Sequence, residues 1–98
     1  MRKYRLLPQA EVEYEEALDY FLGVSVSKAL HFADSFEKTL HMILRFPLIG
    51  SIRFTDFPDL RFYDIDGYDY SFMYNYENDM ILIAGLAHQS RKPGYWME

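Results

Sequence analysis

The stretch from residue 68 to residue 87 reads YDYSFMYNYENDMILIAGLA and combines two strand patterns with a polar turn between them. In residues 68–76 aromatic side chains alternate with polar or smaller ones, which is the period of two that a β-strand produces. Residues 80–87 are apolar on both alternating faces, as in the interior strand of a sheet. The sequence END at 77–79 is typical of turns. The stretch therefore predicts an antiparallel strand pair.

Upstream of this pair, residues 60–65 (LRFYDI) predict a further strand. Residues 47–59 (PLIGSIRFTDFPD) contain two prolines and a glycine and have no sustained periodicity, so we expect a loop or irregular segment. Residues 3–7 (KYRLL) suit a short strand before Pro8. Residues 3–7 and 60–65 therefore add one predicted strand before the helical region and one after it.

Residues 8–23 predict a helix, because apolar side chains recur at spacings of three and four. Pro8 suits its first turn, and Gly23 is a plausible end. The expected inner face comprises Ala10, Tyr14, Ala17, Leu18, Phe21 and Leu22. The opposite face is acidic and comprises Glu11, Glu15, Glu16 and Asp19. We expect this acidic face to be a solvated surface.

A second helix is expected to begin at a cap on Ser25 or Ser27 and to continue until Pro47. Its expected inner face comprises Val26, Ala29, Leu30, Ala33, Phe36, Leu40, Ile43 and Leu44. The short connection predicts an antiparallel helical hairpin. The element order β-α-α-β-β-β then predicts an α+β fold in which the hairpin covers one face of an antiparallel meander sheet.

Composition narrows the class of protein. Ninety-eight residues with half of them apolar are enough for one domain, which we expect to span residues 1–98. The net charge of −5 argues against affinity that comes chiefly from phosphate contacts. The absence of cysteine excludes disulfides and thiolate metal sites, and no phosphate-cradling glycine loop occurs. We expect a soluble cytoplasmic protein without membrane segment, metal or cofactor.

With the elements in this order, the sequence resembles the RelE/ParE superfamily of toxins from type II toxin–antitoxin systems. The resemblance covers essentially the whole chain. It rests on ALHFADSFEKTLHMILRFPLIG (29–50), a long helix ending in a proline and then a glycine. It continues in LRFYDIDGYDYSFMYNYENDMILIAGLAHQSRKPGYW (60–96), which has the family's arginine-bearing, aromatic and apolar strands and its His-x-x-Arg-x-Pro ending.

The resemblance implies two kinds of activity. RelE-like members are metal-independent endoribonucleases that cut mRNA in the ribosomal decoding site, using basic residues with a tyrosine or histidine. ParE-like members poison DNA gyrase and generally lack that set. Members of both kinds are neutralised by an antitoxin whose C-terminal segment wraps the toxin. The segment SIRFTDFPDLR has no paired lysines, and HQSRKP matches the ParE-like ending better. We therefore interpret the chain as ParE-like and as a gyrase inhibitor rather than an enzyme.

Candidate site residues follow from this interpretation. For target binding they are Arg61, Arg91, Lys92, Tyr95 and Trp96, with His88 shaping the docking edge. A nuclease would instead use Arg61, His88, Arg91 and Tyr95, with Arg53 as a possible further cation. The structural alternatives are a hydrogen-bonded histidine at a strand end, solvated tail charges, and a salt bridge from Arg61 to Asp64, Asp66 or an acidic helix residue.

The expected partners are a cognate antitoxin and DNA gyrase, or the ribosome and mRNA in the nuclease interpretation. A partner helix would lie on the hairpin and a partner strand would extend the sheet. Operator DNA would be contacted only through the antitoxin. A third hypothesis is an inactive homologue that serves in antitoxin binding and autoregulation. The tyrosines of residues 68–76 are expected mainly to pack under the helices, and the opposite sheet face to be concave and polar-aromatic.

Overall fold

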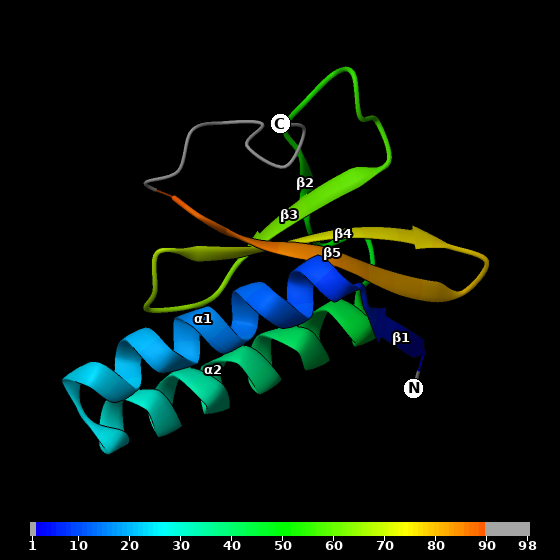
Figure 1. Ribbon diagram of the computed structural model, residues 1–98. Helices are drawn as coiled ribbons and strands as arrows, with labels where there is room; N and C mark the ends of the chain where they lie inside the picture. Colours follow the sequence, from blue (N-terminus) through cyan, green and yellow to red (C-terminus); the bar gives the residue numbers. More distant parts are fainter. Residues whose placement is uncertain (1, 90–98) are drawn as a thin grey trace.

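The computed structural model describes residues 2–89 and confirms the predicted α+β class. Its elements are β1 (Lys3–Leu6), α1 (Pro8–Val24), α2 (Val26–Arg45), β2 (Ser51–Ile52), β3 (Leu60–Asp64), β4 (Tyr70–Glu77) and β5 (Met80–His88). Figure 1 shows the two helices lying side by side along one face of the sheet. Neither helix is long and apolar enough to span a bilayer.

The strands form one sheet in the order β1-β5-β4-β3-β2. The three later strands make the predicted antiparallel meander, and β1 lies parallel to β5. The region expected to be irregular also contains the two-residue strand β2, because Ser51 and Ile52 reach Phe62 and Arg61 of β3. The sheet thus has two strands besides the meander, and β5 is an interior strand between β1 and β4, as its apolar sequence predicted.

The hairpin forms where the sequence predicted it. The Ser25 hydroxyl accepts a hydrogen bond from the Lys28 N–H at 3.0 Å, which satisfies one unpaired donor at the start of α2. The predicted inner faces are wrong at Leu22, Val26 and Leu30, which are exposed. Phe32, which was not predicted, is fully buried. The buried stripe of α2 runs through residues 29, 32, 36, 40 and 43, so residue 30 falls off it at 100° per residue.

The tyrosine strand packs against the helices. Tyr74 and Phe72 are completely buried in the core beneath the hairpin, and Tyr70 and Tyr76 pack at its margin. This confirms the packing interpretation. The expectation of a concave polar-aromatic face on the other side is wrong, because that face carries a second apolar cluster around Leu60, Phe62 and Met73. Phe54 and Phe57, from the segment between β2 and β3, pack against this cluster.

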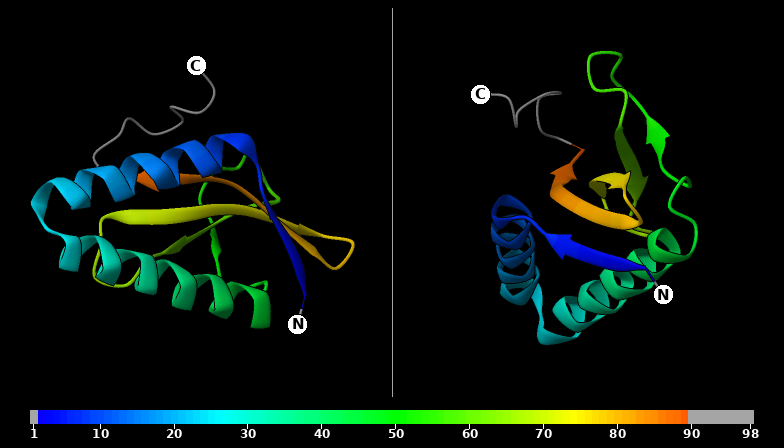
Figure 2. Two further views of the ribbon diagram at one scale, coloured as in Figure 1. Left: turned by 60° about the horizontal axis from the view of Figure 1, so that its bottom comes forward. Right: turned by 90° about the vertical axis from the view of Figure 1, so that its right-hand side faces the viewer.

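A β-bulge interrupts the alternation of β5. Tyr74 pairs with Ile83 and Met73 pairs with Gly85, so Ala84 is an extra residue. The bulge shifts the alternation by one position, and Leu86 therefore joins Ile81 and Ile83 in the core under the helices. The left view of Figure 2 shows β4 between the two helices and the end of β5 next to α1. The bulge thus sets which side chains of the β5 end face α1.

Candidate functional site

Arg61, the predicted strand arginine, holds a turn of the backbone. Its Nη1 atom donates to the carbonyl oxygens of Gly50 at 2.7 Å and of Leu48 at 3.3 Å. The predicted structural alternative, an ion pair with a carboxylate, is therefore not the contact that forms. Because a guanidinium group presents several N–H donors, one arginine can donate hydrogen bonds to two carbonyl oxygens of the same turn. Arg61 thus stabilises the turn at residues 47–50, which leads into β2.

The buried Tyr74 hydroxyl also forms hydrogen bonds with this turn. It donates to the Pro47 carbonyl at 2.8 Å and accepts from the Gly50 N–H at 2.9 Å. Burial raises the pKa of the Tyr74 phenol, against the opposing effects of the Gly50 N–H and the Arg61 charge. Gly50 fits because it has no Cβ, which would lie 2.7 Å from the Tyr74 hydroxyl oxygen. The turn presents Leu48 to solvent.

Arg53, the possible further cation, contacts two side chains of strand β3. Its Nη2 lies 3.1 Å from Asp64 Oδ1, and its guanidinium lies 4.9 Å from the ring centre of Phe62. A hydrogen bond from Ser71 lowers the pKa of the Asp64 carboxyl, with Arg53 adding to the effect against partial desolvation. Because the negatively charged Asp64 lies beside Arg53, Arg53 does not form a purely cationic phosphate site.

His88 is the last residue of β5, opposite Tyr70, and the two rings meet edge to face at 4.7 Å between centres. Arg61 pairs with Tyr74 and so lies two strands away and four residues along the sheet, a separation of about 16 Å between Cα atoms. The structure therefore does not bring Arg61 and His88 together. The other candidates, Arg91, Lys92, Tyr95 and Trp96, lie outside the described residues.

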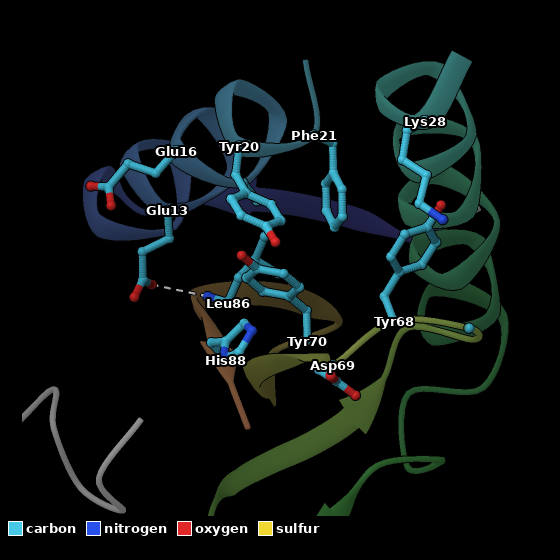
Figure 3. Close-up of a pocket in the computed structure, with 12 residues that line it drawn as sticks. Glu13, Glu16, Tyr20, Phe21, Lys28, Tyr68, Asp69, Tyr70, Leu86 and His88 are labelled. Carbon is cyan, nitrogen blue, oxygen red and sulfur yellow. Dashed lines mark hydrogen bonds between the residues drawn. The ribbon is translucent and has the colours of Figure 1, made fainter. Parts of the chain in front are cut away.

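One cavity lies at the end of the sheet where His88 is found. Its volume is about 570 Å³, and it opens between α1, the start of α2 and the ends of β4 and β5. Figure 3 shows the aromatic rings of Tyr20, Tyr70 and His88 gathered in it, with Glu13 and Glu16 on one side and Lys28 on the opposite side.

Glu13 is the unexpected member of this site. It is 7% exposed, although it belongs to an acidic helix, and its Oε1 accepts a hydrogen bond from the Leu86 N–H at 3.0 Å. Two sequence signals were available. Residue 13 lies three positions after Ala10 and four before Ala17, on the buried stripe of α1. Gly85 is a lone glycine in an apolar strand, which indicates a bulge or a close approach.

Comparison with known proteins agrees with this architecture. Residues 4–93 match the family model described as the ParE toxin of the type II toxin–antitoxin system, parDE. The fold is similar to a solved chain of the chromosomal ParDE toxin–antitoxin system from P. aeruginosa, with a TM-score of 0.73 and 16% identity over 90% of this chain and 96% of that chain. No curated protein matches the sequence.

The family match extends from β1 through the apolar strand β5 and so includes every element of the described fold. The sequence resemblance to the ParE-like branch is thereby confirmed. The chain belongs to the ParE toxin family of type II toxin–antitoxin systems.

Proposed function

We propose that this ParE-family toxin inhibits DNA gyrase and is neutralised by a cognate antitoxin. The observation that carries the proposal is the family match over residues 4–93. The charge of the molecule agrees with it, because a net charge of −5 and an acidic α1 would repel an RNA-lined ribosomal cavity. The proposed target is accordingly a protein surface of gyrase rather than ribosomal RNA.

The environment of the basic residues also favours gyrase over a ribosomal nuclease. RNA cleavage needs cations and a proton-transferring group around one phosphate. Arg61 is occupied by the carbonyls of Leu48 and Gly50, and His88 lies at another part of the sheet. Arg61 then contributes to target binding by fixing the turn that exposes Leu48. Arg91, Lys92, Tyr95 and Trp96 remain proposed contact residues.

For the antitoxin we propose an interface that includes the tip of the hairpin. Tyr20, Leu22, Val24, Val26 and Leu30 expose half or more of their surface there. Such a concentration of exposed apolar side chains is typical of surfaces that a partner covers. A helix of the antitoxin would lie on this end of the hairpin. A strand of the antitoxin would add to an edge of the sheet, at the short strands β1 or β2.

The target is tested by adding purified toxin to a gyrase supercoiling assay and to translating ribosomes. Loss of supercoiling with cleaved DNA is expected, and antitoxin should reverse it. Cleavage of mRNA within ribosomes, abolished by His88→Ala or Tyr95→Phe, would instead establish the nuclease. Growth without arrest in cells and no effect in either assay would identify an inactive homologue that only binds antitoxin.

The antitoxin interface is tested with two variants of similar exposure. Leu30 at the hairpin tip is 66% exposed and Leu48 in the turn before β2 is 64% exposed. Leu30→Asp should weaken antitoxin binding by roughly tenfold or more, because a charge would be buried in an apolar contact. Leu48→Asp should weaken antitoxin binding less than Leu30→Asp does. Equal affinity of both variants would exclude the hairpin tip from the interface.

A further inference from the structure

The end of α2 and the turn after it carry a second group of exposed apolar side chains, which we call the α2-end surface: Met42, Phe46, Leu48 and Ile52. Met42 lies four positions before Phe46, so the two are neighbours at the end of the helix. Ile52 pairs with Arg61, whose guanidinium also holds the carbonyl of Leu48. Exposed apolar side chains gathered in this way are typical of protein-contact surfaces.

The α2-end surface is separate from the hairpin tip. Figure 1 shows the tip and the end of α2 at opposite ends of the helical layer. Leu30 at the tip and Phe46 are 16 positions apart, which corresponds to about 24 Å along a helix. The molecule therefore has two exposed apolar surfaces, at the two ends of α2, and the proposed antitoxin helix occupies the one at the tip.

The charge around the α2-end surface is positive, although the protein is acidic overall. Residues 38–55 contain three basic residues and no Asp or Glu, and two of the three pair with carboxylates from other segments. The third, Arg45, is exposed and lies over the ring of Phe46, 5.6 Å from its centre. Among residues 2–89, neither Arg45 nor Arg61 forms an ion pair. Two positive charges without a carboxylate therefore flank the turn that carries Leu48.

A cavity beside Phe46 gives this surface a hollow. Its volume is about 510 Å³, and it is lined by Arg2, Leu44, Arg45 and Phe46. Arg2 is held there by the Leu44 carbonyl at 3.0 Å and is balanced by Asp79 at 3.2 Å. The Arg45 guanidinium is thus the charge of the cavity that a ligand would balance. A carboxylate on an apolar segment matches both kinds of wall, because charge-assisted hydrogen bonds to arginine are strong.

We propose that the α2-end surface docks an acidic segment of gyrase that also carries apolar side chains. Carboxylates of this segment meet Arg45 and Arg61, and its apolar side chains cover Phe46 and Leu48. Aromatic residues, Met and Arg are enriched in protein–protein interfaces, whereas a phosphate backbone would leave the apolar side chains uncovered. The inference rests on the proposed inhibition of gyrase and adds where gyrase binds the toxin and by which chemistry.

The apolar part of the contact is tested by surface plasmon resonance with purified gyrase and the full 98-residue chain. Leu48→Asp should weaken gyrase binding by roughly tenfold or more, because it places a carboxylate in an apolar contact with an acidic partner. Val12→Asp, at an exposed apolar position of α1, should change the affinity by less than about twofold. Thermal unfolding verifies that both variants fold.

The charge of the contact is tested by Arg45→Gln, which should weaken gyrase binding by roughly fivefold. Lys28→Gln removes the same charge from an exposed position at the other end of α2 and should leave the affinity within about twofold. The difference in affinity between Arg45→Gln and the unmodified chain should shrink as the NaCl concentration rises, because salt screens the interaction.

The outcomes separate the docking surface from the target. An unmodified chain that neither binds gyrase nor inhibits supercoiling would refute the proposed function, and this partner with it. If the unmodified chain does bind gyrase, but Leu48→Asp and Arg45→Gln bind as tightly as their controls, gyrase docks elsewhere and the surface proposal alone is overturned. Binding to duplex DNA that is lost in Arg45→Gln, with gyrase affinity unchanged, would identify a phosphate-binding surface and would also overturn it.

Discussion

Glu13 on α1 and Leu86 on β5 are joined by a hydrogen bond across 73 positions of sequence, from the Leu86 N–H to the Glu13 carboxylate at 3.0 Å. The contact lies just beyond the point where β1 stops pairing with β5 at Ile83. Gly85 allows it, since a Cβ there would lie 2.7 Å from Glu13 Oε1 and 2.5 Å from the Met73 methyl carbon. One carboxylate thus fixes α1 to the end of the interior strand β5.

Replacing Glu13 by alanine should lower the free energy of unfolding by about 1–3 kcal/mol, because the buried Leu86 N–H loses its carboxylate acceptor. Glu13→Gln retains an acceptor oxygen and should recover part of the loss. Glu15→Ala, at an exposed position of the same helix, should change stability by less than about 0.5 kcal/mol. Urea unfolding measures all three, and equal stability of Glu13→Ala and Glu15→Ala would contradict the expected role.

Tyr74→Phe should destabilise the fold by about 1–3 kcal/mol, because the Pro47 carbonyl and the Gly50 N–H both lose their buried partner. Tyr76 is the matched control on the same strand. Within residues 2–89 its hydroxyl makes two contacts, both long, at 3.4 Å to Arg2 and 3.3 Å to Asp79, so Tyr76→Phe should cost less than about 0.5 kcal/mol. Thermal unfolding distinguishes them, and the reverse ranking would refute this assignment.

Two glycine-to-alanine substitutions should change the free energy of unfolding in opposite directions. Gly50→Ala places a Cβ against the buried Tyr74 hydroxyl and should cost about 1–3 kcal/mol. Gly23 lies in α1 with open space around it, so Gly23→Ala should stabilise by up to about 1 kcal/mol through higher helix propensity. Denaturant midpoints test both substitutions. A stabilising Gly50→Ala would show that the turn is not tightly fixed.

The fold should lose stability in alkaline solution, with Tyr74 as a contributor. Burial raises the pKa of this phenol above its ordinary value of 10.0, whereas the unfolded chain ionises it near that value. Above about pH 10 the unfolded state therefore holds fewer protons than the folded state, and the free energy of unfolding falls as the pH rises. This contribution is fully present below the ordinary pKa and is lost above it.

Unfolding experiments between about pH 9 and pH 11 would measure this slope. Burial likewise raises the pKa values of Tyr14 and Tyr68, so a decline should persist in Tyr74→Phe but be shallower. Identical slopes for the original chain and the variant would exclude Tyr74 from the alkaline transition.

Local sequence patterns were sufficient to predict the helical hairpin and the antiparallel meander, and the resemblance to known toxins indicated the ParE-like branch. The Ser25 cap, the alternation through residues 70–76 and the apolar strand after residue 79 are local patterns that the backbone periods of helix and strand impose. The sequence did not predict that β1 pairs in parallel with β5 or that β2 pairs with β3, because strand partners distant in sequence share no local signal.

The partners of the polar groups depend on how the helices and strands are arranged in space. Arg61 binds two carbonyls rather than a carboxylate, and Glu13 enters the core rather than solvent. The physical reason is that a buried polar atom needs a partner within hydrogen-bond reach. For Glu13 the partner within reach depends on the bulge in β5 and on the crossing of α1 over that strand, which sequence periodicity does not encode.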